Sequence, residues 1–319
     1  MPPLPSDEKK SQPLLVPPKK KFFHGSAAGA GWMLLACILY TLLSITIKQA
    51  GQHFSLPEIM FYRNIFTALF GGYLMFKQKH NIITPYWKLA IILGLLAASS
   101  NLTYGYGLIH LPFSLANTLN YTHPIFLALF GVLFLKLPIT SATKLTLLCS
   151  FFGVVLLLQP KSLPSEQWIA GCVALFSGFL AGFLNLTIYR LNVLGEPSAR
   201  VMGYFGTIAA FITAMIVLQQ GGFTPLLGNM WIYALLLGAL SAGAQWFLVR
   251  SFQSGDPAIT SLFSYSTILY SVILDITLFH KNALNAWSYS GIALILASGL
   301  IITWFNPRPP AASTVAKSS

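Results

Sequence analysis

Apolar runs of about twenty residues alternate along this chain with short polar connections that are rich in proline. A helix needs about 20 apolar residues to cross the roughly 30 Å hydrocarbon layer of a membrane. Ten runs approach this length, so we predict an all-α integral membrane protein with ten transmembrane helices. The predicted helices cover residues 28–48, 57–76, 87–108, 113–135, 142–158, 168–190, 198–218, 231–253, 257–279 and 286–305.

The composition supports a membrane protein and argues against a soluble domain. Hydrophobic residues make up 55% of the chain and charged residues 8%, whereas soluble domains carry roughly 25% charged residues. The net charge of +12 does not indicate nucleic-acid binding, because the basic residues lie in the N-terminal tail and between apolar runs. The cysteines lie within apolar runs at no metal or disulfide spacing, so we interpret them as small buried apolar residues: Cys37, Cys149 and Cys172.

The distribution of lysine and arginine predicts which side of the membrane the connections face. Cytoplasmic connections of membrane proteins carry an excess of these residues. With the N-terminus inside, 15 of the 19 basic residues fall on the inner side, and the outer side keeps only Lys48, Arg63, Lys161 and Lys281. We therefore predict that both termini are cytoplasmic, which requires an even number of helices.

The two halves of the chain repeat the same polar positions. Polar and aromatic residues recur at a constant offset of 144 positions, in the pairs Asn101 and Gln245, Asn117 and Ser261, Asn120 and Ser264, and Tyr121 and Tyr265. Because each half has an odd number of predicted helices, the second half enters the membrane from the opposite side. We therefore predict two inverted five-helix repeats, 28–158 and 168–305, joined by an external linker at 159–167. A disordered basic cytoplasmic tail (1–27) precedes them, and a cytoplasmic tail (306–319) follows.

Two short motifs accompany the helix pattern. Pro57-Glu58 is followed by Arg63 in the second predicted helix, and the segment NYTHPIF places Pro124 within the fourth. With ten short helices in a five-plus-five pattern, the chain resembles the EamA-type carriers of the drug/metabolite transporter superfamily over about residues 28–305. The resemblance implies a multi-pass carrier of the inner (cytoplasmic) membrane of a bacterium, with a central path lined by the third, fourth, eighth and ninth helices, and without ATP hydrolysis.

The residues predicted to line this path are polar or aromatic and share helix faces, since residues three, four and seven apart lie on one side of a helix. Inverted repeats place such a path at their interface near the midplane, and Pro124 would free a carbonyl near Asn120 there. Hydrogen bonding between helices is the alternative role for each Ser or Asn, but the matched tyrosines favour the path for the whole set. The set is Asn101, Tyr104, Asn117, Asn120, Tyr121, Gln245, Trp246, Ser261, Ser264, Tyr265 and Tyr270.

Four charged residues near the outer ends of helices are candidates for coupling or charge pairing. A carboxylate within a membrane span costs about 2.5–3.5 kcal/mol, so Asp275 is a candidate to bind a substrate amine or carry a proton; a solvated position near the helix end is the alternative. Glu58 and Arg63 are five residues apart, which is poor spacing for a pair on one helix. We therefore expect Glu58 to pair with Lys48, and Lys48, Glu58 and Arg63 to form an outer gate or a structural ion pair; direct contact with the substrate is the alternative.

Together these features predict a secondary transporter for a small amphipathic metabolite that works by alternating access. Aromatic faces attract ammonium groups, and Asn and Gln offer neutral donors and acceptors, so the predicted substrate is an amino acid or a related amine-bearing compound. A larger cationic nucleoside metabolite such as S-adenosylmethionine is the alternative. The few fixed charges near the midplane argue against sugar phosphates, which usually recruit several Lys or Arg.

Two other classes of protein fit the sequence less well. An intramembrane enzyme needs a nucleophile and base or a metal cluster, and the sequence contains no HExxH, P-loop or G-x-S-x-G motif. We therefore expect no enzymatic activity, no cofactor and no metal. A receptor would carry a sizeable extramembrane domain, which the pattern does not predict. The expected partners are the solute and the lipid bilayer; transport direction, proton coupling and the choice between monomer and homodimer stay open.

Overall fold

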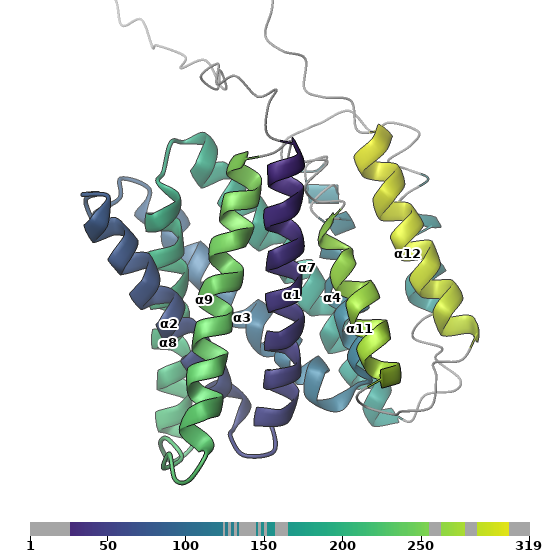
Figure 1. The fold of residues 1–319 in the computed structure, drawn as a ribbon, viewed down its shortest axis with the longest axis horizontal. Helices are drawn as coiled ribbons and strands as arrows, with labels where there is room; N and C mark the ends of the chain where they lie inside the picture. The colour runs from purple at the N-terminus through teal and green to yellow at the C-terminus, as the bar shows by residue number, and fades with distance from the viewer. Residues whose placement is uncertain are drawn as a thin grey trace, which may run out of the picture.

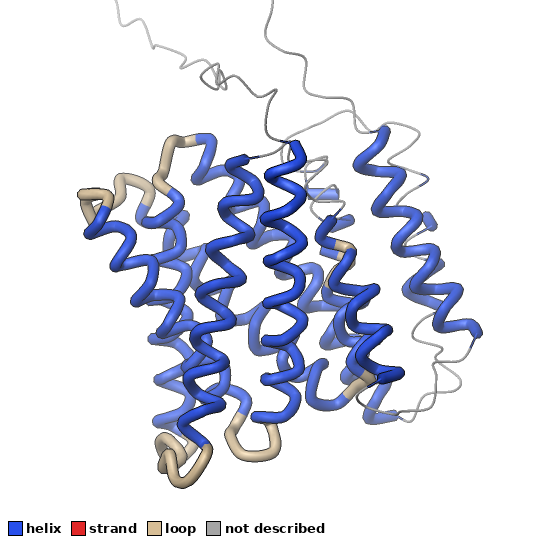
Figure 2. The backbone as a smooth tube through the Cα atoms, in the orientation of Figure 1, coloured by secondary structure: helices blue, strands red, loops and turns tan. Residues whose placement is uncertain are grey.

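The computed structural model describes residues 26–123, 165–254, 263–277 and 286–305, together with 125–126, 129–130, 133, 145, 148–149 and 152–156. These parts form helices joined by short turns and loops, with no strand among them (Figure 2). The helices are α1 (Ser26–Ala50), α2 (Leu56–Lys77), α3 (Trp87–His110), α4 (Phe113–Asn120), α7 (Ser165–Val193), α8 (Ser198–Gln219), α9 (Met230–Ser254), α11 (Ser266–Thr277) and α12 (Ala286–Phe305).

Most predicted helices are found where the hydropathy pattern places them. Helices α1, α2, α3, α7, α8, α9 and α12 begin and end within about three residues of their predicted bounds. Five of these helices (α1, α3, α7, α8 and α9) are long and apolar enough to cross a membrane. The all-helical class is therefore confirmed. The fifth predicted helix, 142–158, lies mostly outside the described residues, so the number of ten stays a prediction.

Helices of the first half of the chain pack mainly against helices of the second half. α2 packs against α8 and α9, α1 against α9 and α11, and α3 against α7 and α8. α4 packs against α7 and α11. Figure 1 shows α1 beside α9, with α2 and α8 on one side of them and α11 and α12 on the other. The contact between the two halves thus forms the interior of the bundle.

Two glycines allow helices of opposite halves to approach closely. A side chain at Gly94 of α3 would lie 2.3 Å from Ile208 of α8, and one at Gly238 of α9 would lie 2.2 Å from Phe66 of α2. Small residues at such crossings let membrane helices gain van der Waals contact. Gly238 follows Gly94 by 144 positions, which is the offset of the polar pairs.

The fourth and ninth predicted helices are interrupted at matching tyrosines. α4 ends at Asn120, and Tyr121 and Thr122 form a turn, whereas the hydropathy pattern predicts an unbroken helix over 113–135. Pro124 lies outside the described residues; a proline at that position has no N–H to donate to the Asn120 carbonyl, which accounts for the interruption. In the second half, Tyr265 lies in a turn directly before α11, within the predicted helix 257–279.

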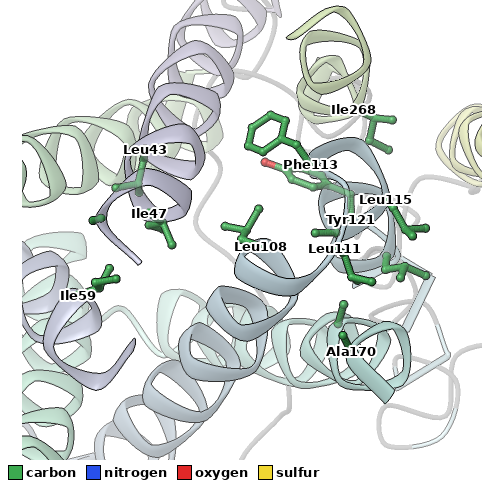
Figure 3. Close-up of a cluster of buried hydrophobic side chains, with 14 of the residues drawn as sticks. Leu43, Ile47, Ile59, Leu108, Leu111, Phe113, Leu115, Tyr121, Ala170 and Ile268 are labelled. Carbon is green, nitrogen blue, oxygen red and sulfur yellow. The ribbon is translucent and has the colours of Figure 1, made fainter. Parts of the chain in front are cut away.

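Apolar side chains fill the interior and also cover the outward faces. Figure 3 shows part of the interior, with Leu108 and Leu111 at the end of α3, Phe113 at the start of α4, and Ile268 on α11. Large exposed apolar surfaces are rare on soluble monomers, so the outward faces fit contact with lipid. Side chains there that are more than half exposed include Leu69, Phe76, Phe211, Leu218 and Ile273.

Candidate functional site

Buried polar side chains from five helices and the turn after α4 meet inside the bundle. Polar groups within a membrane bundle are costly and usually serve a solute, a relay or a helix contact. Asn64 and Asn117 have no exposed surface, and the others are buried or half-buried. We refer to this set as the central cluster: Tyr40 and Ser44 of α1, Arg63 and Asn64 of α2, Asn101 and Tyr104 of α3, Asn117 of α4, Tyr121, and Gln245 of α9.

A chain of hydrogen bonds crosses the cluster through three helices, α1, α3 and α4. The Ser44 and Tyr104 hydroxyl oxygens lie 2.8 Å apart. The Tyr104 hydroxyl donates to the Asn117 Oδ1 atom, and the Asn117 Nδ2 atom donates to the carbonyl of Phe113 at 3.1 Å. These hydrogen bonds join α1, α3 and α4 through the Tyr104 hydroxyl.

Two further hydrogen bonds tie the remaining helices to the cluster. The Tyr40 hydroxyl of α1 donates to the Gln245 Oε1 atom of α9 at 2.7 Å, which links the two halves of the chain. The Asn101 Nδ2 atom of α3 donates to the Asn64 Oδ1 atom of α2 at 3.1 Å. The predicted path residues Tyr104, Asn117 and Gln245 are thus linked through Ser44 and Tyr40, since the Ser44 hydroxyl donates to the Tyr40 carbonyl at 2.7 Å, whereas Asn101 forms a separate pair with Asn64.

Arg63 lies inside this cluster. Arg63 is 8% exposed, and its Nε and Nη1 atoms are buried without a hydrogen-bond partner. The phenol groups of Tyr40, Tyr104 and Tyr121 lie close enough to interact with the guanidinium electrostatically. Arg63 lies nearly two turns into α2 and is buried, and its role in an outer gate stays a prediction.

The two tyrosines at the helix interruptions are both buried. Tyr121 is 9% exposed and Tyr265 is 3% exposed. The Tyr265 hydroxyl has no hydrogen-bond partner, although it is buried. Ser264, the residue before it, is also buried at 9% exposure. These side chains point away from lipid, as a role in the path requires.

Three other predicted path residues lie outside the central cluster. The Asn120 Nδ2 atom donates to the Ser177 hydroxyl of α7 at 2.8 Å, which is a contact between helices. Trp246 packs edge-on against Phe70, with ring centroids 5.7 Å apart, and the Arg250 guanidinium lies 4.9 Å from the Trp246 ring centre. The third, Tyr270, packs at the edge of a small apolar cluster formed by Met33, Ala36 and Cys37.

Two predicted site residues are not placed by the structure. Ser261 lies outside the described residues, and the side chain of Asp275 in α11 lies outside them as well. The role of Ser261 in the path and of Asp275 in coupling therefore stay predictions.

Lys48 and Glu58 have different partners from the expected ones. The Lys48 Nζ atom donates to the carbonyls of Leu108 at 2.8 Å and Leu111 at 2.6 Å, at the end of α3. A cation at a helix C-terminus is favourable, because the last carbonyls carry partial negative charge. Glu58 instead accepts hydrogen bonds from Thr224, in the loop between α8 and α9. The expected pair between Lys48 and Glu58 is replaced by these contacts.

We call the contact of Glu58 with Thr224 and Tyr62 the Glu58 latch. The Thr224 backbone N–H and hydroxyl donate to the two carboxylate oxygens of Glu58, both at 2.9 Å. The Tyr62 hydroxyl also donates to Glu58, at 3.3 Å. Glu58 is 1% exposed, so its carboxylate exchanges water for these three donors. The latch joins the start of α2 to the second half of the chain.

The Glu196 latch is a similar contact of Glu196 with Thr84 and Arg200. The Thr84 hydroxyl, in the loop between α2 and α3, donates to the Glu196 Oε1 atom at 2.5 Å. The Arg200 Nη1 atom lies 2.8 Å from Glu196 Oε2, and Arg200 Nε donates to the Asn81 carbonyl at 2.8 Å. This latch joins the start of α8 to the first half of the chain.

Sequence signals for both latches exist, although only Glu58 among the latch residues belongs to the predicted site. Each threonine precedes a proline, in Thr84-Pro85 and Thr224-Pro225. The first pair precedes α3 and contacts a glutamate of the second half, and the other pair precedes α9 and contacts a glutamate of the first half. Tyr40, Ser44 and Asn64 of the central cluster are also absent from the predicted site, because single polar residues in α1 and α2 have no distinctive spacing. Among the described residues, no group of three or more His, Cys, Asp or Glu side chains could hold a metal ion.

Comparison with known proteins points to one class of protein. Residues 27–159 match the EamA-like transporter family. The chain is 25% identical to the pseudopaline exporter of Pseudomonas aeruginosa strain UCBPP-PA14, covering 84% of this chain and 90% of that protein. It is 24% identical to the riboflavin transporter of Brucella anthropi, covering 85% and 96%, and 23% identical to the S-adenosylmethionine uptake transporter of Rickettsia conorii, covering 88% and 94%.

The fold has a counterpart among solved structures. A crystal structure of another protein is similar with a TM-score of 0.62 and 17% sequence identity, covering 88% of this chain and 97% of that one. The match to a transporter family and the relatives of the chain, together with the helical bundle, define the protein as a membrane transporter of small molecules and not an enzyme. The predicted likeness to EamA-type carriers of the drug/metabolite transporter superfamily is thereby confirmed.

Proposed function

We propose that this protein is a secondary transporter of a small amphipathic metabolite, which it carries across the inner membrane of a bacterium by alternating access. The observation that carries the proposal is the central cluster. Its polar groups come from both halves of the chain, as the hydrogen bond between Tyr40 and Gln245 illustrates. The cluster is closed to the outside in this conformation, since Arg63, Tyr121 and Gln245 are each at most 9% exposed. A closed polar site between two halves is what alternating access requires of an occluded state.

Matched contacts in the two halves support an inverted repeat. If residues 28–158 and 168–305 are equivalent, the packing of α1 against α9 corresponds to that of α7 against α3, and both occur. The contact of Gly94 with Ile208 likewise corresponds to that of Gly238 with Phe66. The match of 27–159 to a transporter family also coincides with the proposed first repeat.

The two latches are the contacts that rocking of the halves has to break. The Glu58 latch lies where α2 begins and α8 has ended, and the Glu196 latch lies where α8 begins and α2 has ended. They therefore close opposite ends of the α2–α8 pair. We propose that one latch opens while the other stays closed, so that the central cluster faces one side of the membrane at a time.

The proposed substrate is an amino acid or a related amine-bearing metabolite. The tyrosine rings of the central cluster offer faces to an ammonium group, and Asn101, Asn117 and Gln245 offer amides. S-adenosylmethionine is the second candidate, which the similarity to an S-adenosylmethionine uptake transporter favours. Relatives named for pseudopaline and riboflavin indicate that the fold itself accepts several kinds of solute.

Uptake of labelled solutes by proteoliposomes tests the proposal. We expect saturable uptake from a panel of amino acids, S-adenosylmethionine and riboflavin, without ATP. Tyr104→Phe should lower uptake roughly tenfold, because it removes one hydroxyl that bridges Ser44 and Asn117, a loss of about 1–1.5 kcal/mol. Tyr106→Phe on the same helix is the matched control and should leave uptake unchanged. Absence of both uptake and solute-induced thermal stabilisation over the whole panel would refute the transporter proposal.

Proton coupling is tested separately at Asp275. If Asp275 carries a proton during transport, Asp275→Asn should abolish the dependence of uptake on a pH gradient while solute exchange continues. If uptake and its pH dependence are unchanged in this variant, Asp275 has no part in the mechanism.

A further inference from the structure

We propose that Arg63 binds a carboxylate group of the transported solute, so that the substrates of this protein are carboxylate-bearing metabolites. The inference rests on the proposed transport function and adds the chemical group that the site selects. It follows from one charged side chain and its surroundings in the central cluster.

The charge of Arg63 is permanent and only partly satisfied. An arginine side chain is not deprotonated in proteins, and it carries five N–H donors and no acceptor. The residue is 8% exposed, and the Nε and Nη1 atoms are buried without an acceptor. A buried charge normally has a partner, because removing it from water is expensive. The unused donors therefore mark a place for an acceptor that the protein does not supply.

The carboxylates of Glu58 and Glu196, whose side chains the structure describes, already have other partners. Glu58, on the same helix, accepts from Thr224 and Tyr62. The ion pair in the described part of the chain is that of Arg200 with Glu196. Among the described groups, the phenols of Tyr40, Tyr104 and Tyr121 lie close enough to interact electrostatically with the Arg63 guanidinium, and a phenol is a neutral group. Among the side chains that the structure describes, no carboxylate pairs with Arg63, and we assign the opposite charge to the solute.

A carboxylate suits this site better than a phosphate. The planar fork of a guanidinium matches the two oxygens of a carboxylate. One guanidinium among neutral phenols and amides balances a single negative charge, whereas a phosphate dianion would keep an unpaired charge in a buried site. The nearby amides of Asn64 and Asn101, which are bonded to each other, are neutral and add no second cation.

Transport of matched solutes tests the choice of group. Uptake by proteoliposomes containing the full chain would be measured for two groups of labelled solutes. The first group is phenylalanine, phenylalaninamide, phenethylamine and phenyl phosphate, and the second is S-adenosylmethionine and its decarboxylated form. We expect the two carboxylates to be transported and each analogue that lacks the carboxylate to be transported on the order of 100-fold less well. Uptake of the amide or the decarboxylated form at the rate of the acid would overturn the inference while the transport function stands. Absence of uptake for every solute would overturn both.

Variants of Arg63 separate binding from a structural role. Arg63→Gln should remove the discrimination between phenylalanine and its amide, and Arg63→Lys should keep part of it, because lysine retains the charge without the fork. Without solute, Arg63→Gln should unfold at a temperature equal to or above that of the unchanged protein, since it removes a buried charge that lacks a partner. A lower unfolding temperature together with intact discrimination would show that Arg63 only supports the fold. Arg250→Gln, at the exposed end of α9, is the control and should change neither property.

Discussion

The Glu58 latch and the Glu196 latch join the same two halves at opposite ends, but they neutralise their carboxylates differently. Glu196 has a cationic partner in Arg200 at 2.8 Å. Glu58 is held by the hydroxyls of Thr224 and Tyr62 and by one backbone N–H. Both carboxylates are almost fully buried, at 9% and 1% exposure. Each end therefore holds a buried glutamate that bonds a threonine of the other half, but within the described part of the chain only Glu196 has a cation opposite its charge.

This difference indicates which end opens at lower free-energy cost. Separating Glu196 from Arg200 breaks a charge-assisted pair as well as hydrogen bonds. Opening the Glu58 end only replaces neutral donors by water, and water solvates the carboxylate well. The Tyr204 hydroxyl adds a bond to the Ile82 carbonyl at 2.7 Å near the Glu196 latch, which strengthens that end further. We expect the Glu58 end to open first from the closed conformation.

Arg200→Met should have the largest effect on this comparison. It leaves Glu196 buried without its cation, and breaking one partner of a buried pair costs about 3–5 kcal/mol. We expect a lower unfolding temperature in detergent and faster amide exchange in the loop at 78–86. Lys88→Met, an exposed cation at the same end, is the control. Unchanged exchange in that loop would show that Arg200 does not hold the Glu196 end closed.

Glu58→Gln should have an intermediate effect. The glutamine keeps the size of the side chain and one acceptor, but it loses the charge-assisted bonds to Thr224, for which we expect a loss of about 2–3 kcal/mol. The measurement is amide exchange in the loop at 220–229, which should accelerate while the loop at 78–86 stays protected. A rise in the unfolding temperature would contradict the prediction, because it would mean that the buried charge costs more than its hydrogen bonds supply.

Valine substitution of the two threonines should give the smallest effects and compare the latches directly. Thr84→Val removes the hydroxyl that bonds Glu196 and also accepts from the Tyr86 N–H at 3.0 Å, so we expect a loss of about 2 kcal/mol. Thr224→Val keeps the backbone bond to Glu58, and we expect a loss of about 1 kcal/mol. Chemical or thermal unfolding of the two variants gives the difference. Equal losses in the two variants would indicate that the Thr224 backbone N–H, which Thr224→Val keeps, contributes little to holding Glu58.

The helices and the central cluster were predictable from the sequence to different degrees. Apolar runs near twenty residues long set the bounds of α1, α8 and α9 closely, because the membrane fixes the length of a spanning helix. The 144-residue offset led to Asn101, Asn117 and Gln245, which the structure brings into one cluster. Helix periodicity gives the face of a residue only relative to its own helix, so it could not separate Trp246 from its neighbour Gln245.

Arg63 shows why a charged residue near a helix end is difficult to interpret from sequence. Distance along the helix suggested an outer position for both Glu58 and Arg63. The surroundings of the two side chains differ, since Glu58 bonds Thr224 in the loop between α8 and α9, whereas Arg63 is buried with Nε and Nη1 lacking a hydrogen-bond partner. Their neighbours come from segments far away in the chain, and a single sequence carries no information on such pairing.

The packing of each half against the other has a consequence for how the protein is made. α1 rests on α9, and α3 rests on α7 and α8, so the early helices meet their partners only after the ribosome has produced most of the chain. Until then Tyr40 lacks Gln245 and Glu58 lacks Thr224, and a newly inserted first half would hold polar side chains in lipid without their final neighbours. Assembly of this bundle is accordingly a late event, and truncated chains are natural targets for membrane quality control.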